Sequence, residues 1–385
     1  MKKFISLLLC IAMCCLLLVS CVDDTIGRDL DEYYERFPVE VREEMELDFY
    51  IVVGEGTTAH SINTVKNHVN YHLEDKFKTT LDIHYLTADE YVETTLGAAA
   101  AKGDDRADIV LVLGKDMFDS LYNDGRLIEL NSYYASNTFG RINSNDLIPE
   151  SLRQMITISN NDNETGVTSN IKYVVPNNHI VGSYEYFMIH KAMAEEVRIG
   201  DKKIQGMTSF DNPDLIDLQN RLVQYRDLLI SKGYDPDQCI VHLEGAMYED
   251  RYSYIENGYV CVEVKTPKDT MTVEDAFAAS YGIVAQEGSA KSNEEHYLRC
   301  MEIIYALYTD TYFRNLLQYG VEVSNYEIVD GNVIRTDTGD NVYNMDLLHT
   351  GTIFNAYYCE ELGWDSVKAV AGAEQNKASY ESDAD

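Results

Sequence analysis

Residues 47–56 of the chain are LDFYIVVGEG, an apolar run rich in aromatic and β-branched residues that ends at two glycines. This composition favours a β-strand, and the glycines favour a turn. Apolar residues then recur three or four positions apart between Ser61 and Phe77, which predicts a helix. The same strand–helix order follows over 81–101, and another apolar run covers 107–113. Alternating apolar strands and helices predict an α/β fold with a parallel sheet covered on both faces.

The middle of the chain predicts a second α/β unit. Its expected strands are 171–175, 184–190 and 259–264, and its expected helices are 192–197 and 215–232. The strands are expected from their β-branched and aromatic content, and the longer helix from its three-or-four-residue apolar spacing. A last long helix over 293–317 is expected to break near Asp310.

The N-terminus has the features of an export leader. Two lysines, Lys2 and Lys3, precede the apolar stretch Phe4–Val19, and Ser20 is followed by Cys21. A basic start, an apolar run and a small residue at the cut site are typical of a secretory signal. The cysteine directly after the small residue resembles the lipobox of bacterial lipoproteins, in which this thiol carries a diacylglycerol. An ordinary leader or a membrane anchor is the alternative, but the run is short for a span of about twenty residues.

Charge and length restrict the function further. Without the two lysines of Met1–Ser20, the formal charge changes from −34 to −36, and 365 residues remain. Such an acidic protein repels phosphate backbones, so nucleic acid is not an expected partner. A chain of this length usually forms two domains. The hydrophobic content of 45% indicates a folded globule.

The cysteines that remain are Cys239, Cys261, Cys300 and Cys359. They form no CxxC pair, so metal binding is not expected. We interpret them as free buried thiols, with a disulfide of unassigned pairing as the alternative.

Four further stretches carry a family resemblance. They are the strand 107–113 followed by the helical passage that ends in GRLIEL (125–130); YVVP (173–176) followed by YFMIHK (186–191); the strand 278–285 followed by a helix that ends in LYTD (307–310); and YGVE (319–322) followed by YEIVDG (326–331). In this order they resemble the extracellular solute-binding proteins of family 1, which deliver ligands to bacterial ABC importers. The resemblance spans about residues 47–375.

The resemblance implies a two-lobed, periplasmic-binding-protein-like clamp of type II with several hinge crossings. The expected parts are a signal peptide (1–20), an acidic tether (21–46), a first lobe (47–180 plus 275–320), a second lobe (181–274 plus 321–375) and a polar tail (376–385). Ligands of open α/β sheets bind beyond the carboxyl ends of the strands. The ligand is therefore expected in the cleft between the lobes.

The expected ligand-binding residues lie at strand ends and lobe crossings. They are Gly54, Glu55, Gly56, Thr57, Gly114, Lys115, Ser183, Tyr184, Tyr186, Tyr281 and Trp364. Aromatic faces stack on sugar rings, and hydroxyls and backbone amides orient polar groups. The resembled family is rich in carbohydrate receptors, so a sugar or an oligosaccharide is the first choice of ligand. A peptide or another polar solute is the second.

An exported enzyme and a surface scaffold are the other classes considered. Residues 54–59 superficially fit the dinucleotide fingerprint G-x-G-x-x-A, but exported proteins rarely meet free NAD. We interpret these glycines as bringing backbone N–H groups to a ligand at a helix N-terminus. Signatures of a hydrolase elbow, a zinc protease and a P-loop are missing from the sequence. The weak calcium-loop pattern at Asn161–Gly166 has Lys172 where glutamate is required.

We therefore expect no catalytic residues, no metal and no cofactor. The sequence predicts a receptor anchored by lipid at Cys21 to the outer face of the cell membrane. Its expected partners are a small-molecule solute, the membrane subunits of an ABC permease and the membrane itself.

Overall fold

The computed structural model describes most of the chain between Asp31 and Cys359. The described residues are 31–32, 35, 38–145, 147–161, 168–177, 184–191, 198–199, 202–203, 223, 226–227, 229–235, 240–246, 250–265, 271–288, 293–329, 332–357 and 359. None of the helices in this part of the chain combines the length and the hydropathy of a membrane span.

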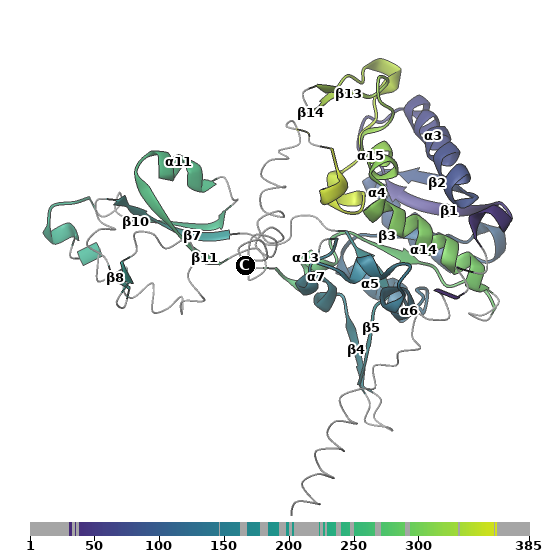
Figure 1. Cartoon of the computed structure of the whole chain (residues 1–385), viewed down its shortest axis with the longest axis horizontal. Helices are drawn as coiled ribbons and strands as arrows, with labels where there is room; N and C mark the ends of the chain where they lie inside the picture. Colours follow the sequence, from purple (N-terminus) through teal and green to yellow (C-terminus); the bar gives the residue numbers. More distant parts are fainter. Residues whose placement is uncertain are drawn as a thin grey trace, which may run out of the picture.

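A five-stranded sheet forms the centre of the larger body (Figure 1). In spatial order its strands are β2 (Thr79–Leu86), β1 (Met45–Val52), β3 (Ile109–Val112), β12 (Ser280–Ile283) and β6 (Val174–Pro176). Strand β1 is parallel to β2 and β3, whereas β12 is antiparallel to β3 and β6. The α/β prediction is confirmed, and the sheet is mixed because the returning strand β12 enters it in the opposite direction.

Helices pack on this sheet and connect its strands. They are α3 (Ala59–Phe77), α4 (Ala88–Ala100), α5 (Gly114–Asn123), α6 (Asn131–Ala135), α7 (Glu150–Met155), α13 (Val273–Ala276), α14 (Glu294–Thr309) and α15 (Thr311–Tyr319). Short 3₁₀ turns lie at η1 (Val39–Val41), η2 (Gly103–Asp105), η3 (Gly140–Asn143), η5 (Gly339–Asn341), η6 (Leu347–His349) and η7 (Ile353–Asn355). One continuous hydrophobic core joins residues from both 47–175 and 271–317.

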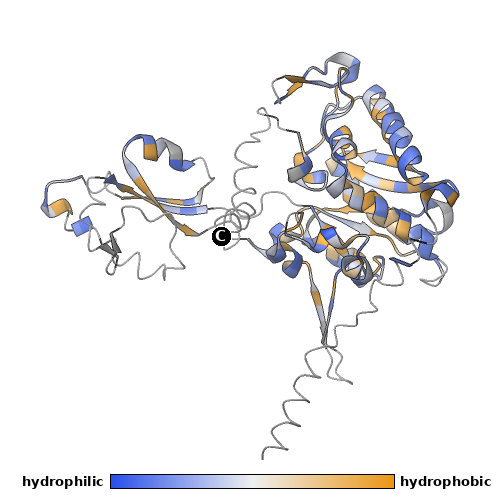
Figure 2. Ribbon diagram, in the orientation of Figure 1, coloured by the Kyte–Doolittle hydropathy of each residue, from blue (hydrophilic) through white to orange (hydrophobic). Residues whose placement is uncertain are grey.

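Helix α3 shows how the sequence determines these contacts. It is largely hydrophilic (Figure 2), and its buried apolar positions are Val65, Val69 and Leu73. This three-or-four-residue spacing places all of them on the face that packs on the core. Asn70 also closes the free edge of β2, because its side chain both donates to the Leu81 carbonyl (3.0 Å) and accepts from the Leu81 N–H (2.8 Å).

The predicted break near Asp310 is confirmed. Helix α14 ends there and α15 begins, with the Asp310 carboxylate accepting a hydrogen bond from the Phe313 N–H at 3.1 Å. Burial raises the pKa of Asp310, but hydrogen bonds from Lys76, His72 and Phe313 outweigh burial and leave that pKa below its usual value. Asp310 is thus the residue at which α14 ends, and its charged side chain caps α15.

A second sheet has three antiparallel strands in the order β10 (Ile240–Ala246), β7 (Tyr184–His190) and β11 (Tyr259–Lys265). Helix α11 (Asp250–Glu256) packs on it, and Figure 1 shows these elements as a separate body. Two further hairpins are β4 (Ile158–Asn161) with β5 (Thr168–Ile171), and β8 (Arg198–Ile199) with β9 (Lys202–Lys203). The predicted helix 192–197 and most of 215–232 lie outside the described residues.

The segment after α15 departs from the sequence-based expectation. Residues 321–375 are expected in the second lobe, yet the described residues 321–357 lie against the first. Tyr343 and Met345 belong to the main core, and the hairpin of β13 (Tyr326–Val329) and β14 (Asn332–Arg335) follows α15 directly. The connection from α15 to β13 is too short for a return to a separate body, because Tyr319 and Tyr326 already contact each other, with ring centroids 5.8 Å apart.

Candidate ligand-binding edge

The chain crosses from the larger sheet to the second sheet and later crosses back. The two crossings meet the larger sheet at neighbouring strands. The chain leaves the larger sheet after β6 and returns to it at β12, and these strands are neighbours that pair Pro176 with Ser280. Just beyond them, the Asn177 N–H donates to the Ala279 carbonyl at 3.0 Å. Strands β1, β3 and β6 end, and β12 begins, at this side of the sheet, which we call the carboxyl edge.

The glycine loop after β1 lies at the carboxyl edge but is covered by its own chain. The Gly54 N–H donates to the Asn344 carbonyl (2.8 Å), and the Asn344 side chain donates to the Glu55 carbonyl (2.7 Å). The Thr57 hydroxyl accepts from the Asn344 N–H at 2.9 Å. A Cβ at position 54 would lie only 2.8 Å from the Asn344 Cβ. Gly54 is therefore required by the close approach of Asn344, and its N–H is not available to a ligand.

The N-terminus of α3, next to this loop, is capped by the chain itself. The Thr58 side chain caps it by accepting from the Ser61 N–H at 3.3 Å, and the Thr58 N–H donates to the Val342 carbonyl at 2.9 Å. Gly54 therefore does not bring its backbone N–H to a ligand, contrary to the expectation for this residue. The exposed parts of the loop are Glu55 and Gly56.

Gly114 and Lys115 lie just past the end of β3, as the sequence predicts. The Gly114 N–H donates to the Phe277 carbonyl at 2.8 Å and opens α5. The Lys115 ammonium pairs with Asp119 and lies 5.6 Å from the centroid of the Phe277 ring. Its side chain is 29% exposed. Lys115 is thus a partly exposed cation at the carboxyl edge.

The predicted cleft tyrosines are core residues instead. Tyr281 is fully buried, and its ring stacks on that of Phe49 with centroids 5.6 Å apart. The Tyr281 hydroxyl donates a hydrogen bond to the His349 carbonyl. Tyr184 and Tyr186 are also buried and stack on each other at 5.1 Å in the core of the second sheet. These burials are contrary to the prediction that the three rings face a ligand. Ser183 and Trp364 lie outside the described residues, as does Cys21.

Two polar side chains that the sequence does not single out, the buried Ser280 and the partly buried His349, also lie at the carboxyl edge. Ser280 is fully buried, and its Oγ has no hydrogen-bond partner among the described residues. The Nδ1 atom of His349 is also without a hydrogen-bond partner in this part of the chain. Burial lowers the pKa of His349, partly opposed by the charge of Asp346 and by a hydrogen bond with the Val52 backbone. The lowered pKa favours the neutral imidazole, which has one donor and one acceptor nitrogen.

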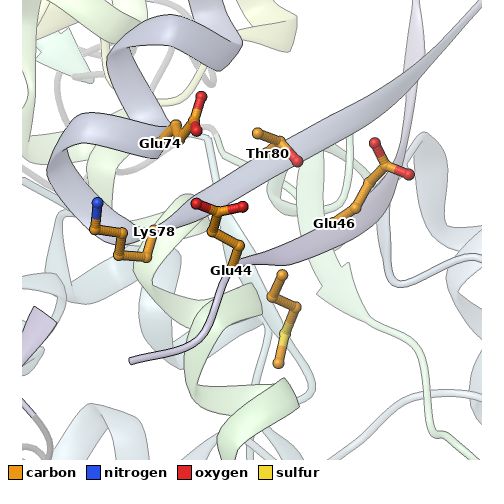
Figure 3. Close-up of a pocket in the computed structure, with 6 residues that line it drawn as sticks. Glu44, Glu46, Glu74, Lys78 and Thr80 are labelled. Carbon is orange, nitrogen blue, oxygen red and sulfur yellow. The ribbon is translucent and has the colours of Figure 1, made fainter. Parts of the chain in front are cut away.

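A shallow pocket of about 270 Å³ lies at the opposite, amino edge, where β1 and β2 begin. Figure 3 shows the side chains of Glu44, Glu46 and Glu74 around it, with Lys78 at one side. The residues that line it include no aromatic ring that could stack on a sugar. This pocket is separate from the carboxyl edge and is not part of the candidate site.

Comparison with known proteins gives structural likenesses only. No protein-family model matches the chain, and no curated protein matches its sequence. A solved N-glycan transport solute-binding protein of Streptococcus pneumoniae, in complex with Man1GlcNAc, is 15% identical with a TM-score of 0.48, covering 87% of this chain and 83% of that one. An extracellular solute-binding protein of Bifidobacterium longum subsp. infantis is 12% identical, with a TM-score of 0.41 and coverages of 85% and 82%.

Another solved protein of Bifidobacterium longum infantis is described as an HMO-binding, ABC-transporter-associated solute-binding protein. It is 10% identical to this chain, with a TM-score of 0.42, and the match covers 84% of this chain and 81% of that one. The function proposed below therefore rests on the residues and topology of this chain itself.

Proposed function

We propose that this chain is an extracytoplasmic receptor that binds a polar solute, with a sugar or an oligosaccharide as the first choice, and delivers it to an ABC import permease. The observation that carries the proposal is the pair of adjacent crossings. The chain completes most of one sheet, builds a second, and returns beside its point of exit, where Asn177 and Ala279 are hydrogen-bonded. Two short connections at one place are the usual structure of a hinge between two bodies that close on a ligand.

The ligand is proposed to bind at the carboxyl edge, next to these crossings. Lys115 and Glu55 offer charged groups there, and Ser280 and His349 offer buried polar atoms without partners among the described residues. A few convergent polar groups of this kind fix the orientation of a small ligand. Ser183 and Trp364 remain predicted members of this site. The buried tyrosines Tyr184, Tyr186 and Tyr281 are proposed to support the two bodies rather than to touch the ligand.

A screen of glycans and peptides by thermal shift tests the proposal. A ligand present at about one hundred times its dissociation constant stabilises the folded state by about 2.7 kcal/mol. We expect an oligosaccharide to give this stabilisation, to be recovered unchanged, and to reduce the radius of gyration in solution scattering. Conversion of the ligand would indicate an exported enzyme, and stabilisation by peptides alone would favour a peptide receptor. If every solute leaves the melting temperature unchanged, the receptor proposal fails.

Lys115→Met tests the location of the site. Loss of a charge-assisted hydrogen bond costs about 1.5–3 kcal/mol, so the dissociation constant of the screened ligand should rise about tenfold or more in calorimetry. Lys102→Met is the matched control, because the Lys102 side chain is 83% exposed at the end of α4, away from the carboxyl edge. Equal affinity of the two variants would place the ligand elsewhere.

The proposed membrane attachment is tested separately through Cys21. Two fatty chains are enough for stable anchoring, so the chain should remain in the membrane fraction of its host after cell breakage. The Cys21→Ala variant should lose processing at this position and membrane retention together. Retention of a processed Cys21→Ala chain would contradict lipid attachment, and a Cys239→Ala variant controls for the loss of a cysteine as such.

A further inference from the structure

Two carboxylates and one imidazole converge on the outer part of the five-stranded sheet. Asp48 of β1 is the register partner of Asp82 of β2, and His84 follows two residues later in β2. Residues two apart in a strand share a face, so all three side chains lie on the same side of the sheet. Their donor atoms lie within 4.8 Å of one another.

The distances between the donor atoms suit three residues that bind one metal ion. The His84 Nε2 lies 2.7 Å from Oδ1 of Asp48 and 3.8 Å from Oδ2 of Asp82. Donor atoms bound tetrahedrally to one zinc ion at about 2.0–2.1 Å lie about 3.3 Å apart. Each of the two measured distances therefore differs from that geometry by only about half an ångström. Rotation of partly exposed side chains can supply this shift.

Neighbouring residues orient the His84 ring and the Asp82 carboxylate and bind the backbone at Asp48. The Tyr50 ring stacks on the His84 ring, with centroids 4.2 Å apart and planes 12° apart. Lys66 pairs with Oδ1 of Asp82, which leaves Oδ2 on the side of His84. The Asp48 N–H donates to Oδ2 of Asp108 at 2.8 Å. A ligand set fixed by outer contacts of this kind binds metal ions more tightly.

The charge at Asp48 also favours a cation. The carboxylates of Asp108 and Asp82 lie close enough to the Asp48 carboxylate to repel it. A divalent ion would relieve the repulsion between these carboxylates. The surface is accessible to such an ion, because the side chains of Asp48, Asp82 and His84 are 30%, 43% and 33% exposed.

We propose that Asp48, Asp82 and His84 form a zinc site with three protein ligands and a fourth position open to water. An imidazole nitrogen combined with carboxylates selects zinc over calcium or magnesium, which prefer oxygen ligands alone. The ion joins edge strand β2 to β1, and it is independent of the ligand at the carboxyl edge.

Zinc titration of the metal-free full chain by calorimetry tests the site. We expect one ion per chain, with binding weakened at least about tenfold in both His84→Gln and Asp82→Asn, since even outer contacts of a metal site contribute 10–100-fold. Cobalt should give the visible absorption of a four-coordinate ion in the native chain and not in His84→Gln. Calcium and magnesium should not compete for the site.

Two control variants separate this site from general binding to an acidic surface. His68→Gln removes an exposed histidine of α3, and Glu46→Gln removes an exposed carboxylate from β1 itself. Both should bind zinc with native affinity, and circular dichroism in EDTA should show that all four variants are folded. The proposal is overturned if the native chain binds no zinc at a one-to-one ratio, or if His84→Gln binds it as tightly as His68→Gln.

Discussion

Replacing Glu302 with alanine is expected to destabilise the chain by about 3–5 kcal/mol, because it removes a carboxylate that is paired with a buried guanidinium. Arg42, in the segment that leads into β1, pairs with Glu302 of α14 at 2.6 Å, and both side chains are only 1% exposed. The loss should appear as a lower urea midpoint with an unchanged slope. Because native domains are stable by only about 5–15 kcal/mol, this is a large share of the total.

Two further variants make the Glu302 test specific. Glu287→Ala removes an acid that is 60% exposed and lies 3.8 Å from Lys102 and 3.9 Å from Arg106, so it should change the urea midpoint little. The double variant Arg42→Met with Glu302→Leu should recover most of the loss, because apolar side chains of similar volume often replace buried ion pairs without cost. A Glu302→Ala chain as stable as Glu287→Ala would mean that water reaches the pair in solution.

The local elements of the first sheet could be predicted from the sequence. The strand over 47–53 and the helix that follows it are marked by an apolar run, two glycines and a regular apolar spacing, all of which are short-range signals. The break at Asp310 is likewise local, because one residue ends α14 and caps α15. Such signals depend on neighbours within one helical turn or one strand.

The partners of the predicted site residues could not be found in this way. Asn344 covers the Gly54 loop, although it lies 287 residues after its hydrogen-bond partner Thr57 in the sequence. No pattern in the sequence connects the two. Asp48 and Asp82 meet only through the register of two parallel strands, so their separation in sequence resembles no metal-binding motif. Contacts of this kind depend on the tertiary fold.

Tyrosine content misled the choice of ligand-binding residues. A buried tyrosine needs only one acceptor for its hydroxyl, and the backbone of this chain supplies it repeatedly. Tyr91 donates to the Leu111 carbonyl at 2.6 Å, and Tyr308 donates to the Pro176 carbonyl at 2.8 Å. With 29 tyrosines in the chain, composition alone does not distinguish rings that fill the core from rings that face a ligand.

Gly351→Ala is expected to destabilise the chain by about 2–5 kcal/mol, and it tests the packing of the C-terminal segment on the first body. Gly351 has a φ of +74°, and a Cβ there would lie 2.5 Å from the carbonyl oxygen of Leu307 in α14. A left-handed backbone costs an alanine about 1–2 kcal/mol, and overpacking adds about 1–3 kcal/mol. Urea unfolding gives the total loss.

Gly339→Ala separates the two contributions to this loss. Gly339 also has a positive φ, +59°, but no heavy atom lies within 4 Å of the place that a Cβ would occupy there. Its substitution should therefore cost only the backbone contribution of about 1–2 kcal/mol. The difference between the two variants measures the contact of residue 351 with α14. Equal losses would show that the segment does not pack on α14 in solution, and would remove His349, two residues away, from the carboxyl edge.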